Sequence, residues 1–196
     1  VLKPIIINGK PLKSVNQYYN KQLAKLKSEL KNEKKTSKRI KSLTAKRNNK
    51  VNDYLHKASR LIVNYLVSNN ISTLVIGKNK EWKQNANIGK RNNQNFVQIP
   101  HTRFIEMLTY KCKLEGITVI IKEESYTSKC SFMDNEPIKK QKVYIGKRIK
   151  RGLFETKEKR LINSDLNGSL NILRKVVGEF QYPIEVCSTP LVLTIK

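Results

Sequence analysis

The sequence predicts an α/β fold that carries a basic helical hairpin. Two short apolar runs, at residues 71–76 and 117–121, lie on either side of a segment with helical periodicity. A strand–helix–strand order of this kind predicts a parallel βαβ unit, in which the helix crosses over the sheet. A long basic region with helical periodicity precedes this unit. Hydrophobic residues make up 38% of the chain, which is sufficient for a core.

The chain opens on a predicted strand at residues 2–7. The strand ends at Asn8-Gly9, which is a hairpin-type turn signal. No segment before it could serve as its partner, and the first residue is valine rather than methionine. We therefore expect the sequence to begin inside a domain.

Two helices are predicted next, separated by a polar turn at residues 32–37. The first carries apolar residues three or four positions apart, which form one stripe on a helix: Val15, Tyr19, Leu23, Leu26 and Leu30. The second has a similar stripe: Ile40, Leu43, Val51, Leu55, Ala58, Leu61, Ile62, Tyr65 and Leu66. Two antiparallel helices over residues 14–69 are the simplest interpretation.

Charge gives this hairpin two interpretations. Residues 21–50 contain 12 Lys and Arg against two acids, Glu29 and Glu33. The basic face could be a solvated surface, or it could lie along a phosphate backbone. Both interpretations allow the apolar face of each helix to pack against the other helix. His56 on the second helix is expected to be a packed or hydrogen-bonded residue rather than a metal ligand or a base, because no His or Cys stands at metal-ligand spacing from it.

The charge of the whole chain favours nucleic acid as a partner. Forty Lys and Arg against 15 Asp and Glu give a formal net charge of +25. Phosphates bind such a surface by releasing counterions, and an anionic membrane is the rival partner. No apolar stretch is long enough for a membrane span. Three widely spaced cysteines argue against a disulfide scaffold and favour a cytoplasmic location.

The predicted βαβ unit begins with the strand that ends at Gly77. A long polar loop at residues 78–98, with Trp82 and Phe96, follows this strand. Pro100 is expected in the first turn of a helix that ends at Gly116 and has a stripe of four apolar residues: Phe104, Met107, Leu108 and Cys112. The strand at 117–121 completes the unit.

The last third of the chain is predicted to be less regular. Residues 125–160 have weak periodicity, with a small basic hairpin at 143–149 and 152–155. A helix that carries Leu170, Ile172, Leu173 and Val176 is expected to follow residues 162–165. The tail contains Pro183 and Pro190 and is expected to be extended.

Carboxylates are scarce, so their positions are informative. Glu123 and Glu124 follow the strand at 117–121, and Asp165 stands at the start of the last helix. Ligands in α/β folds gather at the carboxyl ends of strands, and carboxylate oxygens suit Mg²⁺. The alternative is structural: glutamates at this position are often exposed, and an Asp at a helix start often serves as a cap.

Six segments in consecutive order resemble a known family. They are residues 9–21 (GKPLKSVNQYYNK), 54–60 (YLHKASR), 74–84 (LVIGKNKEWKQ), 93–101 (NQNFVQIPH), 124–132 (ESYTSKCSF) and 163–173 (NSDLNGSLNIL). The chain resembles the C-terminal part of the OrfB/TnpB family of insertion-sequence proteins. Members of that family are RuvC-like, RNA-guided DNA nucleases and are relatives of the type V CRISPR effectors.

The resemblance implies a partial RuvC-like, RNase H-like domain over residues 1–196, incomplete at its N-terminus. It also implies an Asp, Glu, Asp site for Mg²⁺. Asp165 matches the last Asp, and Glu124 matches the Glu, with Glu123 as the second choice. The first Asp is expected on a central strand before residue 1. We therefore expect these 196 residues alone to be marginally stable and not to cleave DNA.

The implied partners are DNA and a guide RNA. Six basic residues of the helical hairpin are expected to follow the nucleic-acid backbone: Lys34, Lys35, Lys38, Arg39, Lys46 and Arg47. Two alternatives remain at this stage. The chain could be a non-catalytic nucleic-acid-binding remnant, or a basic RNA-binding protein unrelated to transposition.

The sequence departs from the family pattern at the zinc ribbon. Many members carry two Cys-x-x-Cys pairs in the segment that corresponds to residues 126–161. Here Cys130 is followed by Ser131, Phe132 and Met133, and the other cysteines, Cys112 and Cys187, lie far away in the sequence. A structural zinc site needs four suitable ligands. We therefore expect a degenerate insert at this position without zinc.

Overall fold

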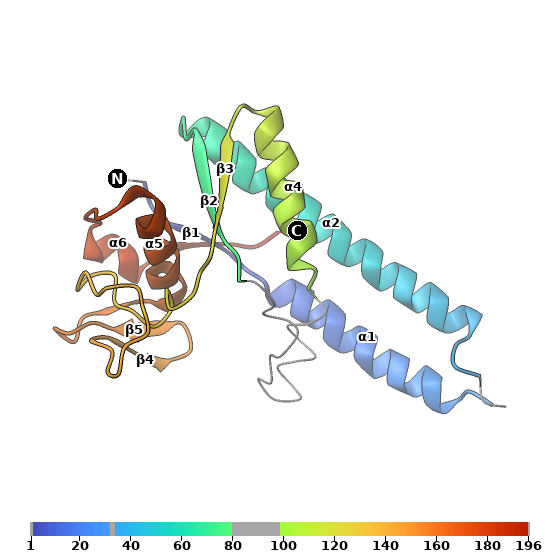
Figure 1. Cartoon of the computed structure of the whole chain (residues 1–196). Helices are drawn as coiled ribbons and strands as arrows, with labels where there is room; N and C mark the ends of the chain where they lie inside the picture. The colour runs from blue at the N-terminus through green and yellow to red at the C-terminus, as the bar shows by residue number, and fades with distance from the viewer. Residues whose placement is uncertain (1, 32–33, 80–98, 196) are drawn as a thin grey trace. The chain divides into compact units, whose positions relative to one another are not determined.

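The computed structural model describes residues 2–31, 34–79 and 99–195 (Figure 1). The chain divides into two compact units. The described residues of one unit, which is mostly helical, are 7–31, 34–71, 99–116 and 194–195, and those of the other, which is mixed, are 2–6, 72–79 and 117–193. Most of the polar loop predicted at 78–98, including Trp82 and Phe96, lies outside the described residues.

Three helices form the described part of the helical unit. Helices α1 (Lys10–Ser28) and α2 (Lys38–Ser68) run side by side as an antiparallel pair, and α4 (His101–Leu114) packs against α2 (Figure 1). The Ser37 hydroxyl caps α2 by accepting a hydrogen bond of 3.2 Å from the backbone N–H of Ile40. Pro100 is the N-cap of α4, one position before the first turn in which the sequence had placed it.

The predicted apolar stripes meet in the core of this unit. Its buried members come from all three helices: Leu12, Val51, Tyr54, Leu55, Ala58 and Met107. Two polar contacts also join α1 to α2. The hydroxyl groups of Tyr19 and Thr44 are 3.1 Å apart, and Nε of Arg47 donates to Oδ1 of Asn16 at 2.8 Å. The helical pair is therefore held by apolar packing along one face and by polar contacts between the two helices.

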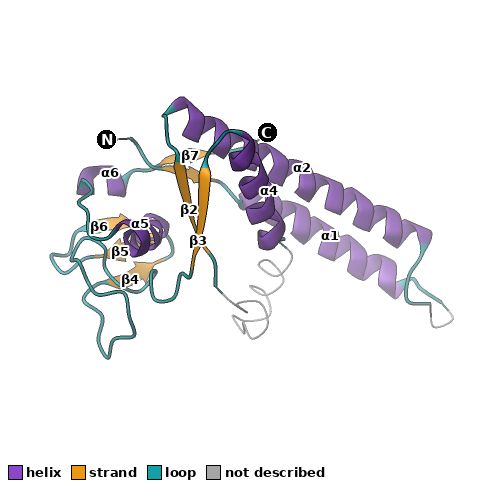
Figure 2. Cartoon of the chain, turned by 45° about the horizontal axis from the view of Figure 1, so that its top comes forward, coloured by secondary structure: helices purple, strands orange, loops and turns teal. Residues whose placement is uncertain are grey.

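The mixed unit contains the parallel strand pair that the sequence predicts. Strands β2 (Thr73–Gly77) and β3 (Thr118–Lys122) pair in parallel, with Gly77 opposite Lys122 at the carboxyl ends of both strands. Helix α5 (Ser164–Val177) packs against both strands. Figure 2 shows β2 and β3 as adjacent arrows of the same direction. Of the candidate acids, Glu123 and Glu124 directly follow β3, and Asp165 lies in the first turn of α5.

A second, antiparallel sheet packs against α5. It consists of β4 (Lys147–Lys150), β5 (Leu153–Glu155) and β6 (Leu161–Asn163), in that order. The basic hairpin predicted from the sequence corresponds to β4 and β5, whereas β6 was not expected. The core of this region combines the sheet, α5 and the following segments: Phe132, Phe154, Ile162, Leu166, Leu170 and Cys187.

The opening strand finds its partner at the other end of the chain. Strand β1 (Ile5–Ile7) pairs with β7 (Leu191–Leu193), and α6 (Ile184–Ser188) precedes β7. The tail is thus partly regular, where the sequence predicted an extended segment. None of the described helices combines the length and the apolar character that a membrane crossing requires.

Candidate functional site

Glu124 lies at the carboxyl ends of the parallel strands, beside a glycine that leaves room for its side chain. Gly77 ends β2, and a methyl group placed on it would lie 2.8 Å from Oε2 of Glu124. The same methyl group would lie 2.5 Å from Cδ1 of Ile172 on α5. The half-buried Glu124 carboxyl group therefore occupies a small space between the end of β2 and α5.

Lys175 of α5 fixes the backbone on both sides of Glu124. Its Nζ donates hydrogen bonds to the carbonyl oxygen of Glu123 at 2.9 Å and to that of Ser125 at 2.8 Å. The exposed carboxylate of Glu123 accepts a hydrogen bond of 2.7 Å from the Ser125 hydroxyl. The two glutamates thus differ: Glu124 lies against Gly77 and α5, and Glu123 lies in solvent.

The environment of Glu124 changes its acidity. Burial raises the pKa of the Glu124 carboxyl group above its ordinary value, and the positive charge of Lys175 opposes this rise. Burial disfavours the ionised form because the surroundings solvate a charge less well than water does. A nearby cation or a bound metal ion would favour ionisation at this position.

Asp165 stands in the first turn of α5 and is exposed. The cap of this helix is Asn163, whose side-chain oxygen accepts hydrogen bonds from the backbone N–H groups of Asp165 at 2.9 Å and Leu166 at 3.1 Å. The Asp165 carboxylate instead forms an ion pair with Arg148 of β4, at 3.5 Å between Oδ1 and Nη2. The capping role that the sequence left open for Asp165 therefore belongs to Asn163.

The two sequence-predicted acids lie along one face of α5 but do not form a complete metal site. Asp165 and Ile172 are seven residues apart, which is about two turns or roughly 10 Å along the helix axis. Ile172 is the residue that shares the space beside Gly77 with Glu124. Among the residues that the structure describes, no group of three His, Cys, Asp or Glu side chains is placed to hold a metal ion.

Glu136 organises the segment that follows Glu124. Its side chain is 1% exposed and accepts hydrogen bonds from the backbone N–H groups of Ser131 at 2.7 Å and Ile145 at 2.9 Å. Arg174 of α5 donates to the backbone carbonyl of Glu136, and its guanidinium group lies 5.7 Å from the ring centre of Phe132. Glu136 thus connects Ser131 to Ile145, and Arg174 connects this segment to α5.

Cys130 lies within the same hydrogen-bonded segment. Its thiol is buried and donates to the carbonyl oxygen of Pro137 at 3.4 Å, and burial raises its pKa. Two asparagines of α5 bind the backbone around it. Nδ2 of Asn167 and Nδ2 of Asn171 both donate to the carbonyl oxygen of Cys130, at 2.9 Å and 2.8 Å. Hydrogen bonds and packing hold the segment at the position where the sequence predicted a degenerate insert.

The basic residues predicted to contact nucleic acid fall into two groups. Five of them are exposed on the hairpin and its turn: Lys34, Lys35, Lys38, Arg39 and Lys46. Arg47 is half-buried and takes part in the contact between α1 and α2, since it binds Asn16 and its guanidinium carbon lies 5.6 Å from the ring centre of Tyr19. Arg47 therefore has a structural role that the sequence did not indicate.

Comparison with known proteins assigns both halves of the chain to related families. Residues 2–83 match the OrfB_IS605 model, described as a probable transposase, and residues 101–172 match the Cas12f1-like TNB domain. The chain is a TnpB-like relative of the type V effectors.

A solved structure shares the fold of this TnpB-like chain. It is the cryo-EM structure of the Cas12f1–sgRNA–target DNA complex, with a TM-score of 0.56 and 18% sequence identity. The match covers 84% of this chain and 42% of that one, so the TnpB-like chain spans less than half the length of its structural relative. Among curated protein sequences, none matches the chain.

Three residues of the site were not singled out by sequence reasoning in the TnpB-like chain. Gly77 was noted only as the end of a strand, although a glycine where two strand ends and a helix meet can indicate a close approach. The sequence did not indicate a role for Lys175 or Arg148, since lysines in the last turn of a helix and arginines on a basic strand are common. Their roles depend on contacts between distant segments.

Gly77→Ala should destabilise the protein by about 1–3 kcal/mol, because the added methyl group displaces both Ile172 and the Glu124 carboxyl group. Gly168→Ala is the matched control within α5. A methyl group at Gly168 meets only the Cα of Ser128 at 4.0 Å, so the helix should gain about 0.5–1 kcal/mol. Urea unfolding of both variants measures the two effects, and equal stability for the two would contradict the close approach at Gly77.

The raised pKa of Glu124 should make stability depend on pH. The folded protein holds the Glu124 proton more tightly than the unfolded chain does, so this contribution is full below the ordinary pKa of the carboxyl group. It is lost as the pH rises through the raised pKa. Glu124→Gln lacks the titration, so in buffer with a metal chelator its stability relative to wild type should increase as the pH rises above the ordinary glutamate pKa of about 4.3. If urea unfolding gives wild type and Glu124→Gln the same dependence of stability on pH, the pKa of Glu124 is not raised.

Proposed function

We propose that this chain is part of a transposon-encoded, RNA-guided DNA endonuclease with an RNase H-like domain. Within that domain, residues 14–69 would form an inserted basic hairpin, and residues 126–161 would occupy the zinc-ribbon position. The matches to the OrfB_IS605 and Cas12f1-like models support the proposal, as does the fold shared with the Cas12f1 chain.

One observation carries the catalytic part of this proposal. The carboxyl group of Glu124 lies in the space left by Gly77, at the carboxyl ends of β2 and β3, on the side of α5 that also carries Asp165. Ligands of α/β proteins collect at this end of a sheet.

The donor chemistry fits a divalent metal ion, and Glu124 and Asp165 would be two of its ligands. Both offer carboxylate oxygens, which hard cations prefer. When bound, such an ion would activate water and stabilise the leaving oxygen of a phosphodiester. Glu124 would be ionised by the approaching cation despite its burial, and Lys175 would hold its backbone. Arg148 would release Asp165, which it holds only through an exposed ion pair.

The third ligand would come from a strand before Val1. Within the described part of the chain, no third acidic or imidazole side chain joins Glu124 and Asp165. A site of three carboxylates that lacks one should lose most of its activity. We therefore propose that residues 1–196 alone do not cleave DNA and that extension upstream restores cleavage.

The proposed partners are DNA and a guide RNA, since the Cas12f1 complex that shares the fold contains an sgRNA and a target DNA. In this chain the support is electrostatic. Helix α1 contains five Lys and helix α2 contains eight Lys and Arg, against one acid, Asp53. That acid is already paired with Lys57 at 3.0 Å. The helical unit thus presents a strongly basic surface, which suits phosphate.

The second candidate function is nucleic-acid binding without catalysis. The incomplete set of acids among the described residues favours it. This candidate predicts steep salt dependence of binding and no response to divalent metal in any form of the chain.

A nuclease assay separates the two functions. Residues 1–196 and the chain extended upstream of Val1 are each purified with the guide RNA and mixed with target DNA in the presence of Mg²⁺ or a chelator. The nuclease proposal predicts metal-dependent cleavage by the extended chain alone. Absence of cleavage by both, with nucleic-acid binding intact, would support the non-catalytic function. Cleavage by the 196 residues alone would overturn the proposed need for an upstream ligand.

A further inference from the structure

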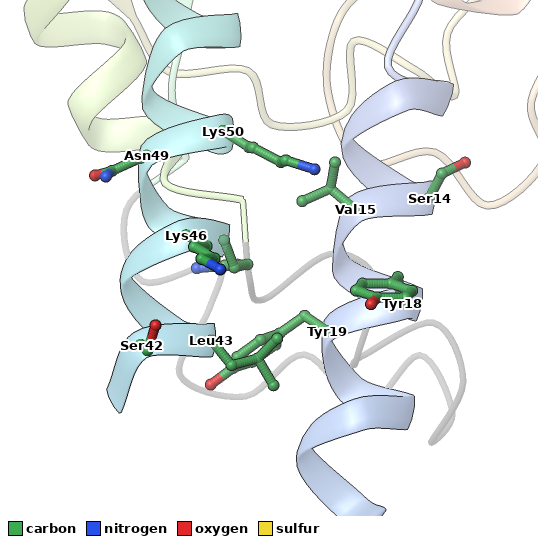
Figure 3. A pocket seen from close by; sticks show the side chains of 10 residues that line it. Ser14, Val15, Tyr18, Tyr19, Ser42, Leu43, Lys46, Asn49 and Lys50 are labelled. Atoms are coloured by element: carbon green, nitrogen blue, oxygen red, sulfur yellow. The ribbon is translucent and has the colours of Figure 1, made fainter. Parts of the chain in front are cut away.

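A groove between α1 and α2 combines an exposed aromatic ring with basic side chains. It has a volume of about 660 Å³ and is lined by residues of both helices, including Val15, Tyr18, Leu43, Lys46 and Lys50 (Figure 3). Figure 3 shows Lys50 reaching from α2 toward Val15 on α1, with Tyr18 on the α1 side. The groove lies entirely within the helical unit, whereas Glu124 and Asp165 belong to the mixed unit.

The two neighbouring tyrosines of α1 have different environments. Tyr19 belongs to the apolar stripe, is half-buried, and is fixed by its contacts with Thr44 and Arg47. Tyr18 is off the stripe and its side chain is 62% exposed. A tyrosine ring that packs on no core yet borders a groove has an open aromatic face. Single exposed aromatic residues are common, so the argument depends on what surrounds the ring.

Charge selects the kind of molecule that suits this groove. Lys46 and Lys50 line it, and in both helices together Asp53 is the one acid, already paired with Lys57. A cationic groove with an aromatic platform is the combination that binds single-stranded nucleic acid, in which the lysines pair with phosphates and a base stacks on the ring. In a duplex the bases are stacked on one another and cannot reach such a ring.

We infer that this groove binds single-stranded RNA by stacking an unpaired base on Tyr18, with Lys46 and Lys50 on the flanking phosphates. This inference rests on the proposed function and assigns a contact site to its RNA partner. Two polar side chains that line the groove, Ser42 and Asn49, favour RNA over DNA. A hydroxyl and an amide can each donate and accept hydrogen bonds, as the 2′-hydroxyl group requires.

The test measures binding of the whole chain to a short, unstructured, fluorescein-labelled RNA by fluorescence anisotropy. Tyr18→Ala should weaken binding roughly 5- to 100-fold, which is the usual effect of removing one stacking residue. Tyr18→Phe should bind like wild type, since the ring is retained. Tyr110→Ala is the matched control, because Tyr110 is 45% exposed on α4 and does not line the groove. It should leave binding unchanged.

Two further probes separate stacking from charge. A strand of the same length without bases should bind wild type and Tyr18→Ala equally. Replacing Lys46 and Lys50 together should reduce the slope of log affinity against log salt by about 1.4, as expected for two phosphate contacts on a single strand. If Tyr18→Ala weakens binding of the base-free strand as much as it weakens binding of the RNA, Tyr18 does not act by stacking on a base.

The outcomes distinguish this inference from the proposed function. If wild type binds RNA and Tyr18→Ala binds equally well, the groove inference is wrong and the proposed function stands. If wild type binds no RNA, the RNA partner of the proposed function fails as well. If the corresponding DNA strand binds as tightly and shows the same loss on Tyr18→Ala, the assignment to RNA is overturned. Circular dichroism checks that each variant is folded.

Discussion

Asp165→Asn should reduce metal-dependent DNA cleavage by more than about 100-fold, measured in the form of the chain that is extended upstream of Val1. Loss of a residue that only supports a metal ligand already costs roughly 10- to 100-fold, so loss of a ligand should exceed this. Because Asn163 caps α5, the substitution should cost no more than about 1 kcal/mol of stability, from the helix dipole. Loss of activity without unfolding would identify Asp165 as a ligand.

The control for this prediction is Asp53→Asn. The two side chains are similarly exposed, at 62% for Asp53 and 71% for Asp165, and each forms an ion pair on the surface. Asp53 lies on α2 in the helical unit and should have no role in cleavage. If both variants cleave DNA equally well, Asp165 is not a metal ligand.

The same assay decides between the two glutamates. Glu124→Gln should lose cleavage as severely as Asp165→Asn. Glu123→Gln should keep it, because the Glu123 carboxylate is exposed and bonded to Ser125 rather than lying beside Gly77. The opposite pattern would show that Glu123 is the ligand.

Glu136→Ala should destabilise the protein by about 3–5 kcal/mol. The substitution leaves the buried backbone N–H group of Ser131 and the partly buried N–H group of Ile145 without their acceptors, and hydrogen bonds to a carboxylate contribute about 1.5–3 kcal/mol each. It also removes an acid that lies close to the buried Arg174. Urea unfolding followed by circular dichroism measures the change.

Glu158→Ala is the matched control for Glu136. Glu158 is 67% exposed, and its contact with Arg160 is a surface ion pair. Such substitutions change stability by less than about 0.5–1 kcal/mol. A loss of similar size for both variants would mean that Glu136 does not hold the segment between Cys130 and Ile145.

Local patterns were sufficient to predict the elements with strong periodicity. The apolar runs that became β2 and β3 were correctly read as a parallel pair, because a helix with a clear stripe separates them. The hairpin of α1 and α2 followed from its stripes and from a polar turn. Strand β6 was missed because three residues directly before a helix show no alternation, and its pairing with β5 is visible only in three dimensions.

The candidate site was predictable only in part, for a related reason. Glu124 and Asp165 were selected because acids are scarce and because their segments resemble a family. The positions of Gly77 and Lys175 beside Glu124 depend on the packing of α5 against two strands that lie far away in the sequence. The sequence offered Asp165 as a possible cap, and the hydrogen bonds identify Asn163 instead.

The contact of Lys175 with the backbone on both sides of Glu124 has a mechanical consequence. Helix α5 carries Asp165 at one end, and near the other end it holds the loop that bears Glu124 through two hydrogen bonds. If this helix moves along its axis, Asp165 and Glu124 should therefore move together. Their separation is thus set by the length of helix between residues 165 and 175, and a deletion within that length would shorten it and turn Asp165 about the helix axis by about 100° per residue.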